Sequence, residues 1–237
     1  MRGWRKLAVA TGLVLTLHVG SARADWQVDA TAAYARGDYQ TAITILRPHA
    51  EQGYAVAENN LGLMYENGRG VVQDYKAAVG WYRKAAEQGS ANAQHNLGLM
   101  YENGRGVVQD YKAAVEWFRK AAEQGYAVAE NNLGYMYGTG KGVAQDYKAA
   151  VGWYRKAAEQ GDALAQRNLG LMYGTGKGVA QDYVKAHALF NMASANGNST
   201  AEQNRDEIAA QMTPDQIAQA QELASKCIAQ HYQNCGF

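Results

Sequence analysis

The 237-residue sequence has no strong charge bias, contains only two cysteines, and has no long apolar run after residue 19. Its 23 lysine and arginine residues are matched by 22 acidic residues, so it lacks the basic field that nucleic-acid binding requires. Residues 1–24 hold four basic residues and no acid, and without them the formal charge falls from +1 to −3. We expect a soluble chain once those residues are removed, with no membrane span and no nucleic-acid partner.

Sequence motifs that carry catalysis are also missing. There is no S-x-x-K, G-x-S-x-G or H-E-x-x-H motif, no Walker loop and no EF-hand loop. The five histidines have no recurring Cys, Ser or carboxylate neighbours that would form a site. Glycine-rich loops such as Gly68-Arg69-Gly70 follow predicted helices and not strands, so they indicate turns and not phosphate cradles. The sequence therefore predicts a protein that is not an enzyme, with no catalytic residues, no metal ion and no cofactor.

The first 24 residues have the pattern of an export signal. Arg2, Arg5 and Lys6 form a positive start, residues 7–19 form a short apolar run, and Ala22-Arg23-Ala24 fits the small-x-small cleavage rule. This pattern predicts cleavage after Ala24 and a periplasmic or secreted protein. The alternative is an uncleaved anchor helix, although the apolar run is shorter than the roughly 20 residues that span a bilayer.

Both cysteines, Cys227 and Cys235, lie near the C-terminus. In an oxidising compartment such a close pair most simply forms a disulfide. A metal site would need further ligands, and His231 is the one candidate nearby.

The dominant pattern is a repeat with a period of 36 residues. The stretch Asn60-Leu61-Gly62-Leu63-Met64-Tyr65 returns near-identically at residues 96–101, 132–137 and 168–173. A fixed period of this size predicts an all-α solenoid of helical hairpins, and such a scaffold points to binding. The expected units are a short hairpin over 25–53, four repeats over 54–89, 90–125, 126–161 and 162–197, and capping helices over 198–237.

Each repeat is predicted to contain two helices, which we call helix A and helix B. Gly62 lies beside the apolar stripe of helix A and is expected to let helix B approach closely, while Gly68 ends helix A and Asp74 caps helix B. Trp81 and its equivalents Trp117 and Trp153 are expected to be core residues of helix B. In the short first hairpin, Pro48 is expected to bend or fray its helix near Leu46–Arg47.

The pattern A-x-x-x-L-G-x-M-Y-x-x-G-x-G-V-x-x-D-Y-x-x-A-x-x-W-Y-x-x-A-A-x-x-G resembles the Sel-1-like repeat family, relatives of tetratricopeptide repeats, over roughly residues 30–232. The resemblance implies a right-handed α/α superhelix whose concave face is built mainly from the A helices. It also implies an adaptor that binds proteins or peptides, as exported bacterial members do, and we expect a monomer. Two alternatives remain: binding to peptidoglycan or the cell envelope, and a β-lactamase-like activity of a cysteine-rich exported branch, whose repeats carry cysteine pairs that these repeats lack.

Residues on the side of helix A away from Leu61 and Gly62 are the candidate partner-binding residues. The hypothesis is that they line the concave face, where a mixed polar and apolar surface suits a peptide. The alternative is a solvated face with some packing leucines. The residues are Asn59, Leu63, Glu66, His95, Leu99, Glu102, Asn131, Tyr135, Arg167 and Leu171.

Overall fold

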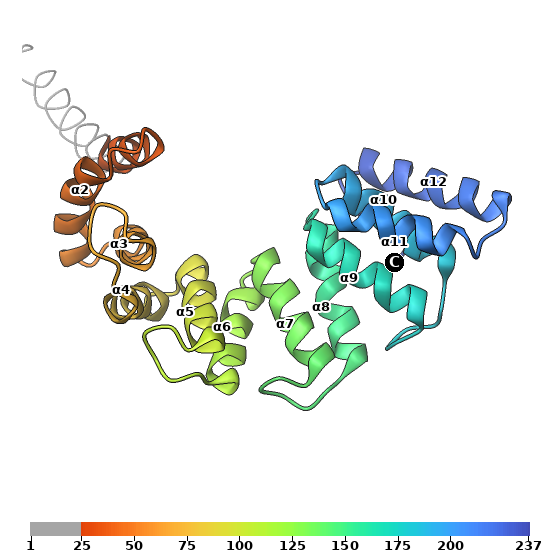
Figure 1. Ribbon diagram of the computed structural model, residues 1–237, viewed down its shortest axis with the longest axis horizontal. Coiled ribbons are helices and arrows are strands. Elements are labelled where there is room, and N and C mark those ends of the chain that lie inside the picture. Colours follow the sequence, from red (N-terminus) through yellow and green to blue (C-terminus); the bar gives the residue numbers. More distant parts are fainter. Residues whose placement is uncertain (1–24) are drawn as a thin grey trace, which may run out of the picture. The chain divides into compact units, whose positions relative to one another are not determined.

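The computed structural model describes residues 25–237, so the predicted export signal and its cleavage site after Ala24 lie outside the described residues. Within residues 25–237 the chain is helical, without strands, and its consecutive helices pack in pairs (Figure 1). In the same range, no helix combines the length and the hydrophobicity needed to cross a bilayer. Contacts divide the chain into two compact units, one of the residues up to Ala93 with Arg105–Val107, the other of Gln94–Gly104 with Val108–Phe237.

The first unit begins with a helix over residues 25–35 and continues with three helices and the start of a fourth. These are α2 (Tyr39–Glu51), α3 (Ala55–Asn67), α4 (Tyr75–Glu87) and the first residues of α5 (Ala91–Asn103). Helix α3 packs against both α2 and α4. The core of this unit includes Trp26, Leu46 and Leu61.

Pro48 lies inside α2 and does not end it, so the predicted fraying near Leu46–Arg47 is wrong. The helix runs on to Glu51, and the N–H of Gln52 donates to the carbonyl of Pro48. Proline removes one N–H from the helix, while Leu46 and Ala50 on either side of it are buried in the core. Burial of these neighbours holds the last turn in place.

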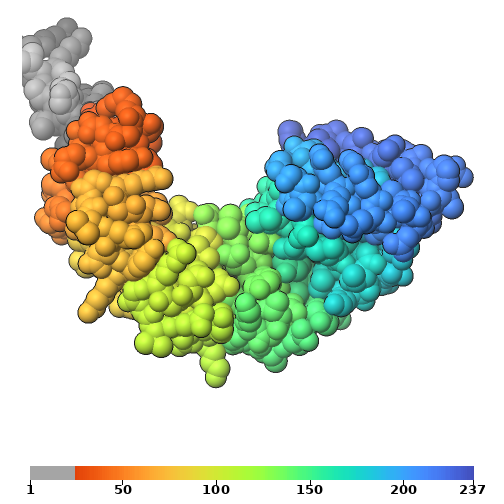
Figure 2. Space-filling view, viewed as in Figure 1, coloured from red at the N-terminus to blue at the C-terminus, as the bar shows by residue number. Residues whose placement is uncertain are grey.

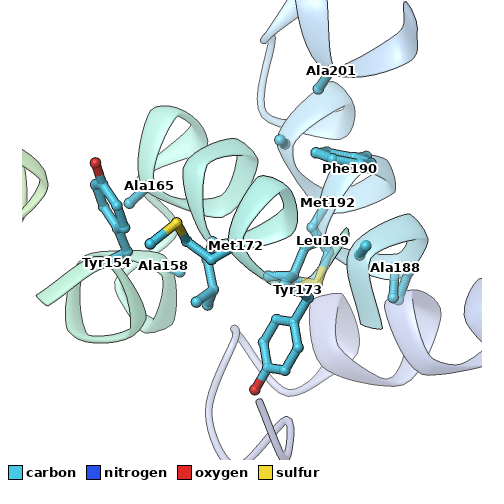
Figure 3. Packing of buried hydrophobic residues seen from close by; sticks show 14 of the residues in the cluster. Tyr154, Ala158, Ala165, Met172, Tyr173, Ala188, Leu189, Phe190, Met192 and Ala201 are labelled. Atoms are coloured by element: carbon cyan, nitrogen blue, oxygen red, sulfur yellow. The ribbon is translucent and has the colours of Figure 1, made fainter. Parts of the chain in front are cut away.

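The second unit contains the rest of α5 and seven further helices. These are α6 (Tyr111–Glu123), α7 (Ala127–Thr139), α8 (Tyr147–Glu159), α9 (Ala163–Thr175), α10 (Tyr183–Ala195), α11 (Ser199–Ala209) and α12 (Pro214–Ala229). Its core extends from α8 to the C-terminal helices, and Figure 3 shows Tyr154, Met172 and Phe190 within it.

Helix ends follow the sequence signals closely. The Asp74 carboxylate accepts the N–H of Ala77 at 3.0 Å, and an aspartate occupies the same capping position in every repeat. Gly68 follows α3 in the left-handed conformation with φ 65°, which a residue with a side chain rarely adopts. At α12, Thr213 and Gln216 form the reciprocal capping box. These local signals mark the start of each helix B, the end of α3 and the start of α12.

The two helices of a repeat meet at a glycine and an aromatic ring. A Cβ on Gly62 would lie 2.7 Å from the ring of Tyr82, and the same contact pairs Gly98 with Phe118 at 2.6 Å. The absence of a side chain at Gly62 is therefore what admits the ring, as the sequence predicted. Gly134 makes the equivalent contact with Tyr154 at 2.7 Å.

The tryptophans, however, are not the deepest aromatic residues, which corrects the prediction. Trp81 is half-buried, while Tyr82 beside it is fully buried. The ammonium of Lys84 lies 4.2 Å from the centroid of the Trp81 ring, and equivalent pairs recur at Trp117 and Trp153. A lysine three residues along the helix thus covers the outer face of each tryptophan, an attractive arrangement for a cation and a ring.

The loop between helices A and B contacts the backbone of the preceding repeat. A Cβ on Gly106 would lie 2.3 Å from the carbonyl oxygen of Tyr75, and one on Gly142 would lie 2.2 Å from that of Tyr111. Both glycines have positive φ, at 71° and 72°. Only glycine fits this approach, because backbone atoms on the other side cannot move aside as a side chain would.

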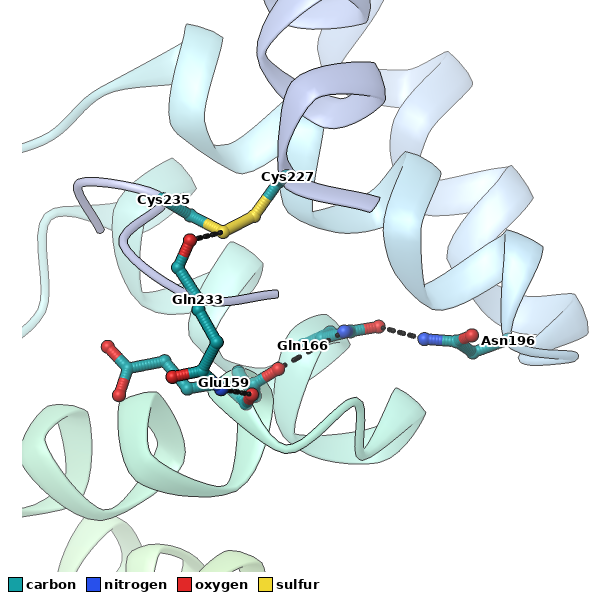
Figure 4. Close-up of a disulfide and its surroundings, with 7 residues drawn as sticks. Glu159, Gln166, Asn196, Cys227, Gln233 and Cys235 are labelled. Atoms are coloured by element: carbon teal, nitrogen blue, oxygen red, sulfur yellow. Dashed lines mark hydrogen bonds between the residues drawn. A yellow bond between two sulfur atoms is a disulfide. The ribbon is translucent and has the colours of Figure 1, made fainter. Parts of the chain in front are cut away.

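The C-terminal helices α11 and α12 (blue) cover the end of the second unit (Figure 2). Helix α12 ends at Ala229. His231 and Tyr232 take positive φ values of 51° and 63°, which turns the chain back on itself. The turn brings Cys235 to Cys227, and the two form a disulfide with Cα atoms 5.2 Å apart (Figure 4).

The tail after α12 is held against the third and fourth repeats. The Tyr232 hydroxyl donates to Asn196 at 2.7 Å, and the Gln233 amide donates to the carbonyl of Glu159 at 3.0 Å. The Lys185 ammonium donates to the carbonyl of Gly236 at 2.8 Å. These bonds and the disulfide fix the tail to helices α8 and α10.

Candidate functional site

The first group of predicted binding residues lies at the contact between neighbouring repeats. Asn59, His95 and Asn131 are only 7%, 8% and 6% exposed. The Asn168 amide donates to the Asn131 carbonyl oxygen at 3.0 Å, and the Arg167 guanidinium donates to Asn204 at 2.8 Å. Residues this buried offer a partner little surface, so this position of the repeat mainly joins one repeat to the next.

His95 is the histidine in this group, and its surroundings keep it neutral. Its Nε2 atom lies 3.0 Å from the Asn132 amide nitrogen, and its ring packs against those of Phe118 and Tyr126. Burial lowers the pKa of His95, and a hydrogen bond with Asn96 opposes this in part. A neutral ring that accepts from Asn132 is a packing residue and not a proton donor or a metal ligand.

The second group, at the position after the Leu-Gly pair, is more accessible. Tyr135 is 40% exposed, and its hydroxyl accepts a hydrogen bond from the Lys141 ammonium at 3.2 Å. Leu63, Leu99 and Leu171 are half-buried. Leu63 lines a pocket of about 180 Å³ in the first unit, and Leu171 lines two pockets in the second. This position therefore borders the hollows of both units.

The third group contains two glutamates at the end of helix A. Glu66 accepts a hydrogen bond from the Tyr82 hydroxyl at 2.6 Å and lies 3.8 Å from the guanidinium of Arg105. Burial, followed by that hydrogen bond, raises the pKa of Tyr82 far above its usual value. Glu102 is half-buried opposite a phenylalanine, Phe118, which has no hydroxyl. Burial raises the pKa of the Glu102 carboxyl.

In the third and fourth repeats this glutamate is replaced by Gly138 and Gly174. Gly138 lines an open pocket of about 320 Å³ between α7, α8 and α9. The other residues that line it are Thr139, Tyr147, Tyr154, Leu171, Met172, Thr175 and Lys177.

Beside Gly174, the space that the glutamate side chain would occupy is partly filled by a C-terminal helix, α11. A Cβ on Gly174 would lie 3.2 Å from the end of the Ile208 side chain in α11. A smaller hollow of about 210 Å³ remains there, and Glu207 and Gln211 contribute to its lining.

Gly138, Tyr154 and Lys177, which line this pocket, are not among the binding residues predicted from the sequence. The signal was present in the repeats themselves, because the equivalent position reads Glu66, Glu102, Gly138 and Gly174 in order. The sequence does not show, however, that the space beside Gly138 stays open, because this depends on how the helices pack.

A further set of buried polar residues is structural. The Gln88 amide donates to the Glu58 carboxylate at 2.6 Å, and Gln160 donates to Glu130 at 2.7 Å. Burial raises the pKa of both carboxyls. Each bond joins the start of helix A to the end of helix B, so these groups clamp the hairpin shut.

Sequence comparison assigns the repeats. The profile of the Sel1 repeat matches residues 55–90, 91–126, 127–162 and 163–198. The chain belongs to the Sel1 repeat family. This family has a non-catalytic scaffold fold that generally serves protein interaction. No curated protein matches the chain.

Solved structures with Sel1 repeats have the same fold. A protective antigen of uropathogenic Escherichia coli with an SLR (Sel1-like repeat) fold is 36% identical with a TM-score of 0.74. The match covers 92% of this chain but 48% of that one, so this chain spans about half the length of the antigen. A Sel1 repeat protein from Oxalobacter formigenes is 36% identical over 84% of this chain and 83% of that one, with a TM-score of 0.73.

One more distant structure shares the fold alone. An immunity protein from Pseudomonas aeruginosa is 21% identical over 88% of this chain and 84% of that one, with a TM-score of 0.53. The two structures that are 36% identical, together with the four matched repeats, identify the chain as a helical solenoid of Sel1 repeats. Within its described residues, no three His, Cys, Asp or Glu side chains gather into a metal site.

Proposed function

We propose that this protein is an exported scaffold that binds a protein or peptide through the exposed surface of its A helices. One observation carries the proposal: the residue after the Leu-Gly pair borders a hollow in each unit, at Leu63 in the first and at Leu171 in the second. Hollows that recur with the repeat suit an extended partner, which can contact several repeats at once. The half-exposed Tyr135 lies at the same position and offers an aromatic contact.

Export is supported by the charged and apolar pattern of residues 1–24 and by the disulfide between Cys227 and Cys235, which an oxidising compartment would preserve. Sequencing the N-terminus of the protein recovered from the periplasm or medium tests this part. A mature start at Asp25 is expected. Retention of residues 1–24 in the membrane fraction would refute cleavage.

Binding is tested by photo-crosslinking in the cells that make the protein. A photoreactive amino acid is placed at Tyr135 or Leu63, and a matched control carries it at Lys76, an exposed position on helix B of the first repeat. Adducts of defined mass from Tyr135 and Leu63 but not from Lys76 are expected. Equal adducts from all three positions, or from Lys76 alone, would contradict binding through the A helices.

A further inference from the structure

The first and third repeats place nearly the same groups around one point, but only the first supplies a carboxylate there. In the first repeat the Glu66 carboxylate lies between the Tyr82 hydroxyl, at 2.6 Å, and the Arg105 guanidinium, at 3.8 Å. Thirty-six residues separate equivalent positions in adjacent repeats, so two repeats later the same places are held by Gly138, Tyr154 and Lys177. All three line one pocket within the second unit.

Within residues 25–237 the Tyr154 hydroxyl makes no hydrogen bond, although the Tyr135 side chain is near enough to contribute to the rise in its pKa. Gly138 lacks the side chain that would accept the bond, and a Cβ added there would lie 3.8 Å from the Tyr154 hydroxyl. Figure 3 shows the Tyr154 ring beside Ala165 and Met172, with its hydroxyl turned away from Ala158. Burial raises the pKa of Tyr154 to about 12, so the hydroxyl keeps its proton at neutral pH.

The pocket also has the charge that a carboxylate requires. Its lining includes the Lys177 ammonium and no acidic residue. The hydroxyls of Thr139 and Thr175 already donate to carbonyls of their own helices, so the donors that remain in the lining are Lys177 and the hydroxyls of Tyr147 and Tyr154. The Lys177 ammonium lies 5.5 Å from the centroid of the Tyr147 ring. Leu171 and Met172 form an apolar wall that suits the methylene groups of an acidic side chain. By contrast, the hollow beside Gly174 contains Glu207 and would repel an anion.

We propose that the pocket formed by Gly138, Tyr154 and Lys177 binds a carboxylate of a partner polypeptide, which takes the place that Glu66 fills in the first repeat. This inference rests on the proposed scaffold function and adds the chemistry of the partner: an acidic side chain or a chain terminus. The hydroxyl donates to one carboxylate oxygen, and the ammonium pairs with the carboxylate from the solvent side.

The test is a titration of the ¹⁵N-labelled protein, followed by its amide NMR spectrum, with small probes. N-acetyl-glutamate N-methylamide carries a side-chain carboxylate, N-acetylalanine carries a chain-terminal carboxylate, and N-acetyl-glutamine N-methylamide is the neutral control. The amides of Gly138, Thr139 and Thr175 are expected to shift with one or both carboxylates and not with the glutamine probe. The carboxylate probe that binds more tightly shows whether the partner presents an acidic side chain or a chain terminus. Equal shifts with the neutral probe, or none with any probe, would overturn the proposal.

The repeats supply the variants. Gly138→Glu installs the carboxylate that the first repeat already has and should abolish the shifts. Tyr154→Phe, a residue that folds at this position as Phe118 and Phe190, should weaken binding about tenfold. Lys177→Gln should weaken it about threefold, while Lys177→Arg should restore it. Tyr82→Phe, the same change at the filled site, is the matched control and should leave probe binding unchanged.

A Gly138→Glu protein that keeps its spectrum and still binds the probe would refute the pocket, and so would a Tyr154→Phe protein that binds the probe as tightly as the wild type. Crosslinking then separates this inference from the scaffold function. Partners that crosslink equally to the wild type and to Gly138→Glu would leave the scaffold function standing without the pocket. Probe binding by a protein that crosslinks to no partner would keep the pocket and refute the scaffold.

Discussion

The first repeat, residues 54–89, and the third, residues 126–161, differ at only five of 36 aligned positions. The differences are Leu63/Tyr135, Glu66/Gly138, Asn67/Thr139, Arg69/Lys141 and Val72/Ala144. All five lie at the end of helix A or in the loop after it, and the helix B sequences are identical. One consequence is visible in the core, because Tyr82 is 0% exposed under Glu66 while Tyr154 is 6% exposed beside Gly138.

The comparison shows that folding and surface chemistry are assigned to different positions of the repeat. The glycine that admits the aromatic ring, the aspartate cap and the glutamate–glutamine clamp are the same in both repeats. The end of helix A differs between the two repeats, and there Glu66 contacts only the hydroxyl at the outer end of the Tyr82 side chain. Four experiments test this division of roles, and they are given in order of decreasing effect.

The largest effect is expected at the glycine that both repeats share. Gly134→Leu forces a side chain into the ring of Tyr154, where even a Cβ would lie at 2.7 Å, and should lower the free energy of unfolding by about 3 kcal/mol. Gly138→Ala, in the same helix, meets Ala150 only at 3.7 Å and should raise it by about 0.5 kcal/mol. Urea unfolding followed by circular dichroism measures both changes. Similar effects from the two substitutions would contradict the assignment of one glycine to packing and the other to the pocket.

The second effect concerns the tail, which contacts the third repeat and has no counterpart on the first. Reducing the bond between Cys227 and Cys235 should weaken closure of the tail by about 2–3 kcal/mol, as expected for so short a loop. Because Gln233 donates to the Glu159 carbonyl, amide exchange should rise around residues 159–161 and in α12. The equivalent residues 87–89 of the first repeat serve as the internal control. Mass-spectrometric hydrogen exchange that shows the same change at both places would be evidence against local anchoring.

The third experiment gives the first repeat the glycine that the third repeat has at Gly138. Glu66→Gly leaves the buried Tyr82 hydroxyl without its acceptor and should cost about 2 kcal/mol of unfolding free energy. Glu102→Gly makes the same change opposite Phe118, which has no hydroxyl, and should cost about 1 kcal/mol, the helix-propensity difference alone. Thermal unfolding of the two variants measures the difference. An equal loss would mean that the tyrosine–glutamate bond contributes nothing.

The smallest effect depends on pH and concerns the position that reads Asn59, His95 and Asn131. Because burial lowers the pKa of His95, the unfolded chain takes up a proton at this histidine before the folded one does. Its contribution to stability is therefore complete above the unfolded pKa of about 6.5 and is lost as pH falls below it toward the folded pKa. The His95→Asn protein should lose less stability than the wild type between pH 7.5 and 5.5.

The buried carboxyls of Glu58 and Glu130 have raised pKa values and act in the opposite sense as pH falls. Both carboxyls are present in the wild type and in the His95→Asn protein, so their contributions cancel when the two proteins are compared. Urea midpoints measured at the two pH values give the result. Parallel profiles for the two proteins would show that His95 does not titrate differently on folding.

Most of the fold could be predicted because its signals are local. The 36-residue step, the aspartate caps and the glycine beside the apolar stripe each act within one repeat, and the structure places them as the sequence indicates. The sequence does not show which of Trp81 and Tyr82 is buried in the core, because the two are neighbours on one helix and both are aromatic. What separates them is the rotation of helix B against helix A, which periodicity does not define to within one residue.

The exposure of the candidate binding residues was harder to predict because it depends on contacts between repeats. Asn131 was placed on the open side of helix A, yet its amide oxygen meets Asn168 in the next repeat. How far one hairpin turns relative to the next decides this contact, and no pattern within a single helix records that angle. Leu63, Tyr135 and Leu171 remain candidates on the accessible side.

The loop glycines that rest on the backbone of the preceding repeat have a consequence for how such a protein changes in length. At Gly142 the neighbour is the carbonyl of Tyr111, and at Gly178 it is that of Tyr147, each at the start of the preceding helix B. This junction requires a glycine in the loop, but it meets the main chain of the preceding helix B and so does not depend on which side chains that helix carries. At this junction whole repeats can therefore be duplicated, lost or exchanged by recombination without a matching change in the neighbouring helix B, and only the side-chain contacts between A helices, such as that of Asn131 with Asn168, have to match.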